Sequence, residues 1–281
     1  MIILDKIIEY MLEEDIGFGD ITSDAVVEEA LVVNASIISK DEGVLAGNEI
    51  IKDLFDEKEV RVLFWLKDGS KIRPGDVLMS LKGDARTILL LERTALNLVM
   101  RMSGVASAAA RYVSMVRDFD VKVAGTRKTS PALSKFDKYA LKVGGADTHR
   151  FCLDDMILIK DNHIATCSNP LEALKKAQKN ASFSKKIEIE VENLKDAKEC
   201  VLNHADIVML DNMAPDVVGD FINDLNKDNI RSNSLIEVSG GINEENIAEY
   251  ASTGVDIISV GALTHSSRSL DFSLKIEKGS E

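Results

Sequence analysis

Five cationic side chains in the middle of the chain have the types and spacing to bind a multiply charged anion: Arg127, Lys128, His149, Arg150 and Lys160. Arginine offers a planar fork that matches a carboxylate, while lysine acts as a point charge. Five cations in one cavity would repel one another unless the ligand carried several negative charges. The pattern therefore predicts a site for a polyanion. The alternatives are separate surface ion pairs and, for Lys160, a solvated strand end.

Two carboxylates, Glu190 and Asp211, each follow an apolar run of the kind that forms a buried strand. Carboxylates in that position can hold Mg²⁺ through a water shell, bind ribose hydroxyls or stabilise an electron-poor sugar carbon in a transition state. The alternative is that they only neutralise Lys160 and its neighbours. We favour contact with a ligand.

Two glycine-containing loops, Ser239-Gly240-Gly241 and Gly261-Ala262, follow later apolar runs, and we expect each to open a helix. Backbone N–H groups at a helix N-terminus bind phosphate. His265 either contacts the same phosphate or caps its helix. By residue types alone, the predicted ligands are a phosphorylated sugar and a multiply carboxylated molecule, with Mg²⁺.

The elements that must position these residues are six strands, each followed by a loop and a helix. The apolar runs that we expect to form the strands are 121–124, 156–159, 187–189, 207–210, 235–238 and 257–260. Repeated strand–helix units with short loops imply a parallel sheet, and active sites of β/α barrels lie at the carboxyl ends of the strands. We predict an incomplete β/α barrel with fewer than eight strands; a doubly wound open sheet is the alternative.

The residue pattern of the first third of the chain predicts a small unit with helices and an antiparallel sheet. A long helical pattern then runs from Asp84 to Arg117. We expect it to break at Ser103-Gly104, which gives domains of residues 1–103 and 104–266. Arg93 lies in this helix, where it either pairs with Glu92 or serves a site.

Composition limits the classes of function. The formal charge of −13, from 34 basic and 47 acidic residues, excludes a broad electrostatic nucleic-acid binder. The three cysteines, Cys152, Cys167 and Cys200, lack the spacing of metal ligands and predict free thiols in a reducing compartment. We expect no signal peptide and no membrane span, and hence a cytoplasmic protein.

The chain resembles the quinolinate phosphoribosyltransferases, the carboxylating nicotinate-nucleotide pyrophosphorylases of NAD biosynthesis. Motifs in family order carry the resemblance over nearly the whole chain: Glu14-Asp-Ile-Gly-Phe-Gly-Asp-Ile-Thr-Ser23, Gly43-Val-Leu-Ala-Gly47, Glu92-Arg-Thr-Ala-Leu-Asn97, Gly125-Thr-Arg-Lys-Thr129, His149-Arg150, Leu158-Ile-Lys-Asp-Asn-His163, Glu190-Val-Glu192, Leu210-Asp-Asn212, Ser239-Gly-Gly-Ile242 and Gly261-Ala-Leu-Thr-His265.

The resemblance implies an N-terminal α/β sandwich domain, rejoined by the tail 267–281, and an incomplete β/α barrel. It implies transfer of a phosphoribosyl group from 5-phosphoribosyl 1-diphosphate to quinolinate with decarboxylation. The products are nicotinate mononucleotide, CO₂ and diphosphate. It also implies a homodimer, with further assembly in some members, in which the partner's first domain completes each active site.

The resemblance assigns roles to individual residues. Arg93 reaches into the partner's site. Arg127, His149, Arg150 and Lys160 bind the two carboxylates of quinolinate, and Lys128 serves substrate and diphosphate. Glu190 and Asp211 face the ribose and its Mg²⁺. The 5-phosphate is held by Ser239, Gly240, Gly241, Gly261 and Ala262. Lys128, Lys160, Glu190 and Asp211 are the expected catalytic residues.

One position departs from the family pattern, and other functions stay open. Thr148 precedes His149-Arg150, where many bacterial members have asparagine; threonine still offers a hydroxyl donor. The alternatives are a paralogous phosphoribosyltransferase of unsettled substrate linked to molybdate transport and a non-catalytic phosphosugar-binding protein. A nicotinate-type transferase would need fewer cations, and a Schiff-base aldolase would need Lys160 as its nucleophile.

Overall fold

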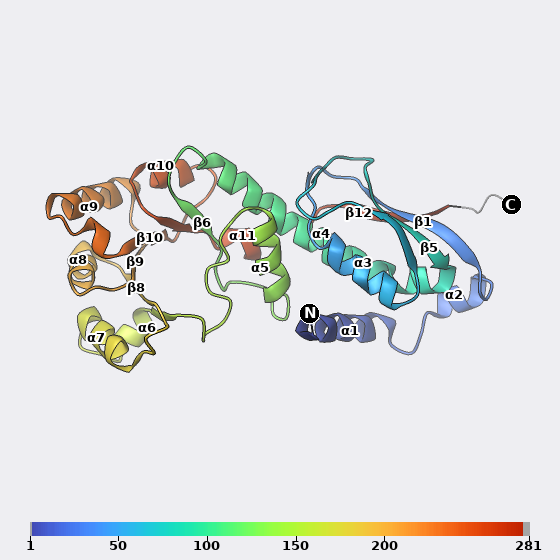
Figure 1. Ribbon diagram of the computed structural model, residues 1–281, viewed down its shortest axis with the longest axis horizontal. Coiled ribbons are helices and arrows are strands. Elements are labelled where there is room, and N and C mark those ends of the chain that lie inside the picture. Colours follow the sequence, from blue (N-terminus) through green and yellow to red (C-terminus); the bar gives the residue numbers. More distant parts are fainter. Residues whose placement is uncertain (1, 278–281) are drawn as a thin grey trace. The chain divides into compact units, whose positions relative to one another are not determined.

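The computed structural model describes residues 2–277, which pack as two compact units (Figure 1). The first unit holds the chain up to residue 110, the segment 130–145 and the chain from residue 266. The second holds residues 111–129 and 146–265. The segment 130–145 thus packs with the first unit, although it lies in the middle of the stretch assigned to the barrel from the sequence.

The first unit is an α/β sandwich. A four-stranded antiparallel sheet with the order β12-β1-β5-β3 lies beside a two-stranded sheet of β2 and β4. Its elements are α1 (Ile2–Ile16), α2 (Ile21–Val26), β1 (Val32–Ser39), β2 (Gly43–Val44), α3 (Asn48–Glu57), β3 (Arg61–Trp65), β4 (Lys71–Ile72), β5 (Val77–Asp84), most of α4 (Ala85–Met115), α5 (Ser134–Val143) and β12 (Phe272–Glu277).

The core of this unit follows from alternating burial along its strands. In β1, Val33, Ala35 and Ile37 are buried on one face, as the period of two in a strand requires. Ile51 and Phe55 of α3 are fully buried at helical spacing, and α3 packs on β3. Residues near the C-terminus belong to the same sheet, since β12 pairs with β1.

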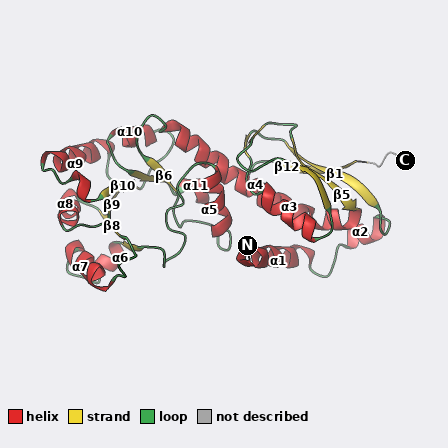
Figure 2. Ribbon diagram, viewed as in Figure 1, coloured by secondary structure: helices red, strands yellow, loops and turns green. Residues whose placement is uncertain are grey.

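The second unit is the incomplete β/α barrel that the sequence predicts. Its elements are β6 (Lys122–Ala124), β7 (Ile157–Ile159), α6 (Asp161–Ile164), α7 (Pro170–Asn180), β8 (Ile187–Val191), α8 (Leu194–Leu202), β9 (Ile207–Asp211), α9 (Pro215–Lys227), the short 3₁₀ helix Arg231–Asn233, β10 (Leu235–Ser239), α10 (Ile247–Ser252), β11 (Ile257–Ser259) and α11 (Ala262–His265). In Figure 2 its larger helices lie outside the strands.

The strand order distinguishes a barrel from a doubly wound sheet. Six parallel strands follow the order β6-β11-β10-β9-β8-β7. Strands β7 to β11 are neighbours in chain order, and β6 lies beside the last of them, as the first strand of a barrel does. A doubly wound sheet reverses its order at a switch point. The seam lies between β6 and β7, where the described chain has only an isolated bridge from Ala124 to Asp147.

Helix α4 is continuous, so the predicted break at Ser103-Gly104 is wrong. Glycine is needed there for close packing within the first unit: a Cβ on Gly104 would lie 2.2 Å from the backbone oxygen of Arg268. The Ser103 hydroxyl accepts a hydrogen bond from the Ala46 backbone N–H at 3.0 Å. Both residues fix the helix against its neighbours instead of forming a hinge.

Within the described chain, none of the helices has the length and apolar content to cross a bilayer.

Two glycine substitutions test this packing. Gly104→Ala should lower the free energy of unfolding by about 1–3 kcal/mol, because the added methyl group overlaps the Arg268 backbone. Gly219→Ala in α9 is the matched control: its Cβ would meet nothing closer than the Thr253 methyl at 3.9 Å. It should raise stability by up to about 1 kcal/mol through helix propensity. Urea unfolding of both variants measures the difference; equal effects would contradict the close approach at Gly104.

Candidate active site

The carboxyl ends of neighbouring strands bring the predicted site residues to one edge of the second unit. Lys160 directly follows β7, Glu190 lies in β8, Asp211 ends β9 and Ser239 ends β10. Asp211 and Ser239 are in register, and Ile159 is in register with Ile189, one residue before Lys160 and Glu190. In-register residues of parallel strands point to the same face. Charged side chains and the Ser239 hydroxyl therefore lie together at the carboxyl ends of these strands.

Lys160 and Glu190 form an ion pair across β7 and β8. The Lys160 side chain is 40% exposed and that of Glu190 is 14% exposed, so the pair lies at the mouth of the site. Asp211 accepts a hydrogen bond from the side-chain amide of Asn212 at 2.6 Å.

The loop after β6 carries Arg127 and Lys128, both exposed, and is tied to α11. The Thr264 hydroxyl donates to the Lys128 backbone oxygen at 2.7 Å. Gly261 lies under two side chains: a Cβ there would be 3.2 Å from His265 Nε2 and 3.3 Å from Lys128 Cδ. Lys128, Gly261 and His265 are therefore neighbours, as a shared anion site requires, and Ala262 begins α11 beside them.

The other glycine loop has an unusual backbone. Gly240 and Gly241 have φ values of 90° and 63°, in the region that favours glycine. A Cβ on Gly240 would lie 2.2 Å from Asn212 Oδ1, so the loop approaches the end of β9 closely. The expectation that this loop opens a helix is wrong, because α10 begins only at Ile247. The expectation holds for Gly261, which α11 follows directly.

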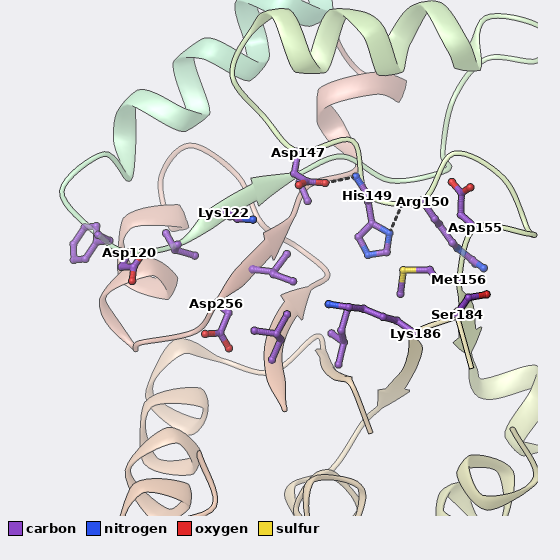
Figure 3. A pocket seen from close by; sticks show the side chains of 16 residues that line it. Asp120, Lys122, Asp147, His149, Arg150, Asp155, Met156, Ser184, Lys186 and Asp256 are labelled. Carbon is purple, nitrogen blue, oxygen red and sulfur yellow. Dashed lines mark hydrogen bonds between the residues drawn. The ribbon is translucent and has the colours of Figure 1, made fainter. Parts of the chain in front are cut away.

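His149 and Arg150 lie in irregular chain between β6 and β7 (Figure 3). His149 has φ 51°, a left-handed conformation. Its N–H donates to Asp147 Oδ1 at 2.7 Å, and its ring Nδ1 accepts from the Arg150 N–H at 2.8 Å. The Thr148 hydroxyl donates to the His149 backbone oxygen at 3.0 Å. Threonine at the position that departs from the family thus makes a local backbone contact.

Sequence reasoning missed two carboxylates inside the barrel. Glu188 and Glu237 are fully buried, and each places Oε2 3.3 Å from His149 Nε2. Ser259, also buried, donates to Glu237 Oε1 at 2.5 Å. A period of two could have revealed both carboxylates, because Glu188 precedes Glu190 by two residues and Glu237 precedes Ser239 by two. Each shares the face of a predicted site residue.

Burial and neighbouring charges shift the pKa values in this interior. Burial alone lowers the pKa of His149, but its contacts with Glu188 and Glu237 outweigh it and raise the pKa to about 10. Burial raises the pKa of Glu188, while His149 opposes that rise. The extra proton belongs to the cluster as a whole. Because Nδ1 accepts the Arg150 N–H, the ring carries a single proton on Nε2, and the extra proton of the cluster is held by the carboxylates.

The cations also influence one another. Burial and the charge of Arg127 lower the pKa of Arg150, whereas Glu188 and Asp155 raise it. The charges of Arg127 and Arg150 are therefore close enough to repel each other, as is expected of two cations that bind the same anion.

A cavity of about 610 Å³ lies at the opposite, amino-terminal end of the strands (Figure 3). Lys122 and Lys186, near the starts of β6 and β8, line it together with His149 and Arg150. His149 and Arg150 thus face this cavity, whereas Lys160 and Glu190 are not among the residues that line it.

Arg93 belongs to the first unit. It lies on α4, its side chain is 59% exposed, and its guanidinium is 4.0 Å from Glu92. The sequence left two alternatives for Arg93, pairing with Glu92 or service in a site, and the structure contains the first contact. The contact is weak because water reaches both groups.

Comparison with known proteins identifies relatives of this chain. Two family models match the chain: the C-terminal domain of quinolinate phosphoribosyl transferase over residues 105–275 and its N-terminal domain over residues 20–103. A relative from Methanocaldococcus jannaschii, named as a probable nicotinate-nucleotide pyrophosphorylase (carboxylating), is 46% identical over 275 residues, 96% of each chain. A relative of that name from Methanothermobacter thermautotrophicus is 43% identical over 272 residues, 96% of this chain and 98% of the relative.

A solved structure shares the fold over nearly the whole chain. The nicotinate-nucleotide pyrophosphorylase from Francisella tularensis superimposes with a TM-score of 0.90 at 34% identity, which covers 98% of this chain and 96% of that one.

The raised pKa of His149 predicts a pH dependence of stability. A group whose pKa is raised by folding stabilises the fold fully below its unfolded value, here 6.5, and the effect is lost as the pH rises toward about 10. His149→Asn tolerates the left-handed backbone but lacks this ionisation. We expect the stability advantage of the wild type over this variant to be largest at pH 6 and to narrow steadily up to pH 10.

Urea unfolding at half-unit pH steps measures the effect, with His204→Asn as the matched control. His204 is exposed and has a similar φ of 57°. A constant difference between the wild type and His149→Asn across pH 6–10 would contradict the ionisation of the cluster.

Proposed function

The chain belongs to the quinolinate phosphoribosyl transferase family, and from this premise we propose that it transfers a phosphoribosyl group from 5-phosphoribosyl 1-diphosphate to quinolinate. The observation that carries the proposal is the meeting of cations and carboxylates at one strand edge. Arg127, Arg150 and Lys160 suit a dicarboxylate, and Glu190 with Asp211 suits a sugar that becomes electron-poor.

The reaction proceeds in two bond exchanges. The pyridine nitrogen of quinolinate forms a bond to the anomeric carbon of the ribose as the bond to diphosphate breaks. The ring nitrogen is then quaternary and draws electrons. When the carbon–carboxylate bond breaks, CO₂ leaves, the electron pair stays on the ring carbon, and that carbon takes a proton. The product is nicotinate mononucleotide.

The cations bind and orient the anionic reactants. Arg127, Arg150 and Lys160 hold the carboxylates of quinolinate so that its nitrogen faces the sugar. His149 serves this binding through Arg150, because both of its ring nitrogens already have protein partners. Positioning of this kind supplies much of the rate. Lys128 serves quinolinate and the departing diphosphate. Its closeness to Gly261 and His265 supports a shared anion site there.

Glu190 and Asp211 would hold Mg²⁺, directly or through water. Their carboxylate oxygens are hard donors, as this ion prefers, and they lie on adjacent strands. When bound, Mg²⁺ would neutralise charge on the diphosphate. The residues themselves place negative charge beside the sugar carbon. Glu190 must exchange its contact with Lys160 when ligands arrive.

The 5-phosphate would lie in the loops that hold Ser239, Gly240, Gly241, Gly261 and Ala262. The left-handed backbone of Gly240 and Gly241 supports this role, because successive exposed N–H groups can form an anion-binding nest. His265 lies over Gly261 and is placed to contact the same phosphate.

We also propose a homodimer in which Arg93 completes the partner's site. The exposure of Arg93 and its weak contact with Glu92 support a role outside its own surroundings. A cytoplasmic location stays a prediction; the free cysteines agree with a reducing compartment. The family membership disfavours the molybdate-linked paralogue and the non-catalytic binder.

The direct test is an assay of purified protein with quinolinate, 5-phosphoribosyl 1-diphosphate and Mg²⁺, with nicotinate in parallel. We expect release of CO₂ and diphosphate from quinolinate alone and loss of turnover in EDTA. Arg127→Ala and Lys160→Ala should each lower kcat/KM by about 100-fold or more, because each removes charge-assisted hydrogen bonds. Arg117→Ala and Lys176→Ala, at exposed positions, are the controls. Turnover of nicotinate instead would overturn the assignment of the cations.

Mixing two inactive variants tests the shared site. In a hybrid dimer of Arg93→Ala and Lys160→Ala, one site carries both changes and the other carries neither. Equal mixing with subunit exchange should therefore restore about one quarter of wild-type activity. If Arg93 acts within its own subunit, every site of the hybrid keeps one defect, and the mixture stays as inactive as its components.

A further inference from the structure

The segment that carries His149 and Arg150 lacks the hydrogen-bonded ladder that holds Glu190, Asp211 and Ser239. In the described chain it spans the seam between β6 and β7, where sheet pairing is limited to the isolated Ala124–Asp147 bridge. Its backbone is also left-handed at His149. A non-glycine residue keeps such a conformation only when its surroundings determine it. Side chains must therefore hold this segment.

The side chain of His149 is fixed at both ring nitrogens. Nδ1 accepts the Arg150 N–H at 2.8 Å, and Nε2 lies 3.3 Å from a carboxylate oxygen of both Glu188 and Glu237. Ser259 in turn donates to the far oxygen of Glu237 at 2.5 Å. A chain of contacts therefore runs from the barrel wall through the imidazole to the backbone of Arg150.

The burial of the Glu188 and Glu237 carboxylates is not explained by a contribution to the stability of the fold. Both are fully buried, and among the described residues the oxygens of Glu188 have no polar partner besides His149 Nε2, 3.3 Å from Oε2. Barrel interiors are ordinarily filled by branched apolar residues, and buried carboxylates are costly unless a specific partner needs them. Here that partner is the Nε2–H group of His149.

The three groups also have the spacing of metal ligands. The hydrogen bond at Nδ1 argues against a metal. A ligating histidine donates its second N–H to an acceptor, whereas Nδ1 here faces the N–H donor of Arg150. Nε2 therefore carries the imidazole proton and is a donor to the carboxylates.

We propose that Glu188 and Glu237 are positioning residues for the dicarboxylate substrate: they orient His149, which fixes the backbone of Arg150. The inference rests on the proposed role of Arg150 in binding quinolinate. Neither carboxylate touches the reactants. Ser259 supports Glu237, so it belongs to the same positioning set.

The test compares Glu188→Gln, Glu237→Gln and Ser259→Ala with the wild type. We expect the KM for quinolinate to rise about 10- to 100-fold in the two glutamine variants, the range for loss of a hydrogen bond that involves a charge. Ser259→Ala should have a smaller effect in the same direction. The KM for 5-phosphoribosyl 1-diphosphate should change by less than about twofold, because a local positioning role spares the second substrate.

A substrate-free measurement makes the test independent of the proposed function. Amide hydrogen exchange at Arg150 should accelerate by about tenfold or more in the glutamine variants, because the acceptor at His149 Nδ1 loses its fixed position. Ile207→Val, a small deletion in the same barrel interior, is the control and should leave this amide and both KM values unchanged. Circular dichroism establishes that each variant is folded.

Unchanged exchange at Arg150, or a parallel rise of both KM values, in folded variants would overturn the positioning role. If the wild type does not turn over quinolinate, the proposed function fails, but the exchange data still decide whether the carboxylates hold Arg150. If a glutamine variant does not fold, the KM for quinolinate and the amide exchange of Arg150 in Ser259→Ala decide whether the positioning role holds.

Discussion

The contact between one imidazole and two buried carboxylates is the interaction on which the barrel's active edge most depends. Six strands of the described chain form the barrel, and the segment that spans its seam carries His149 and Arg150. Without ladder hydrogen bonds, that segment is held through His149, whose ring lies between Glu188 and Glu237. The cost of burying two carboxylates is offset by a proton that they share with the imidazole. An incomplete barrel thus replaces sheet pairing with a polar interior.

The parallel register of neighbouring strands positions the residues at the strand ends. Residues that are far apart along the chain reach the same edge because each ends a strand in a continuous row. Lys160 meets Glu190 across two strands, and the loop of Lys128 is tied to α11 through Thr264. Rigid strand ends hold such groups more precisely than long loops would. Arg127 and Arg150 lie close enough that burial and the charge of Arg127 lower the pKa of Arg150.

Glycine has two different uses in this fold, and sequence alone does not separate them. Gly240 combines a left-handed backbone with a close approach to Asn212, so it shapes a loop. Gly104 lies inside a continuous helix and lets Arg268 approach. The local signal of a small residue in a helical pattern suggested a break at Gly104. The partner that explains it lies more than a hundred residues further along the chain, where no local pattern can indicate it.

The sequence by itself determined the parallel strands, the antiparallel first unit and the candidate site residues at strand ends. The spacing of apolar residues and the polar residues that follow each apolar run are local properties, so the sequence contains them directly. Motifs such as Gly125-Thr-Arg-Lys-Thr129 added the family. Only the tertiary structure placed β6 beside β11, assigned the segment 130–145 to the first unit and gathered Glu188, Glu237, Ser259 and His149 into one cluster. Contacts of this kind depend on strand order and barrel curvature, which join residues that no spacing along the chain connects.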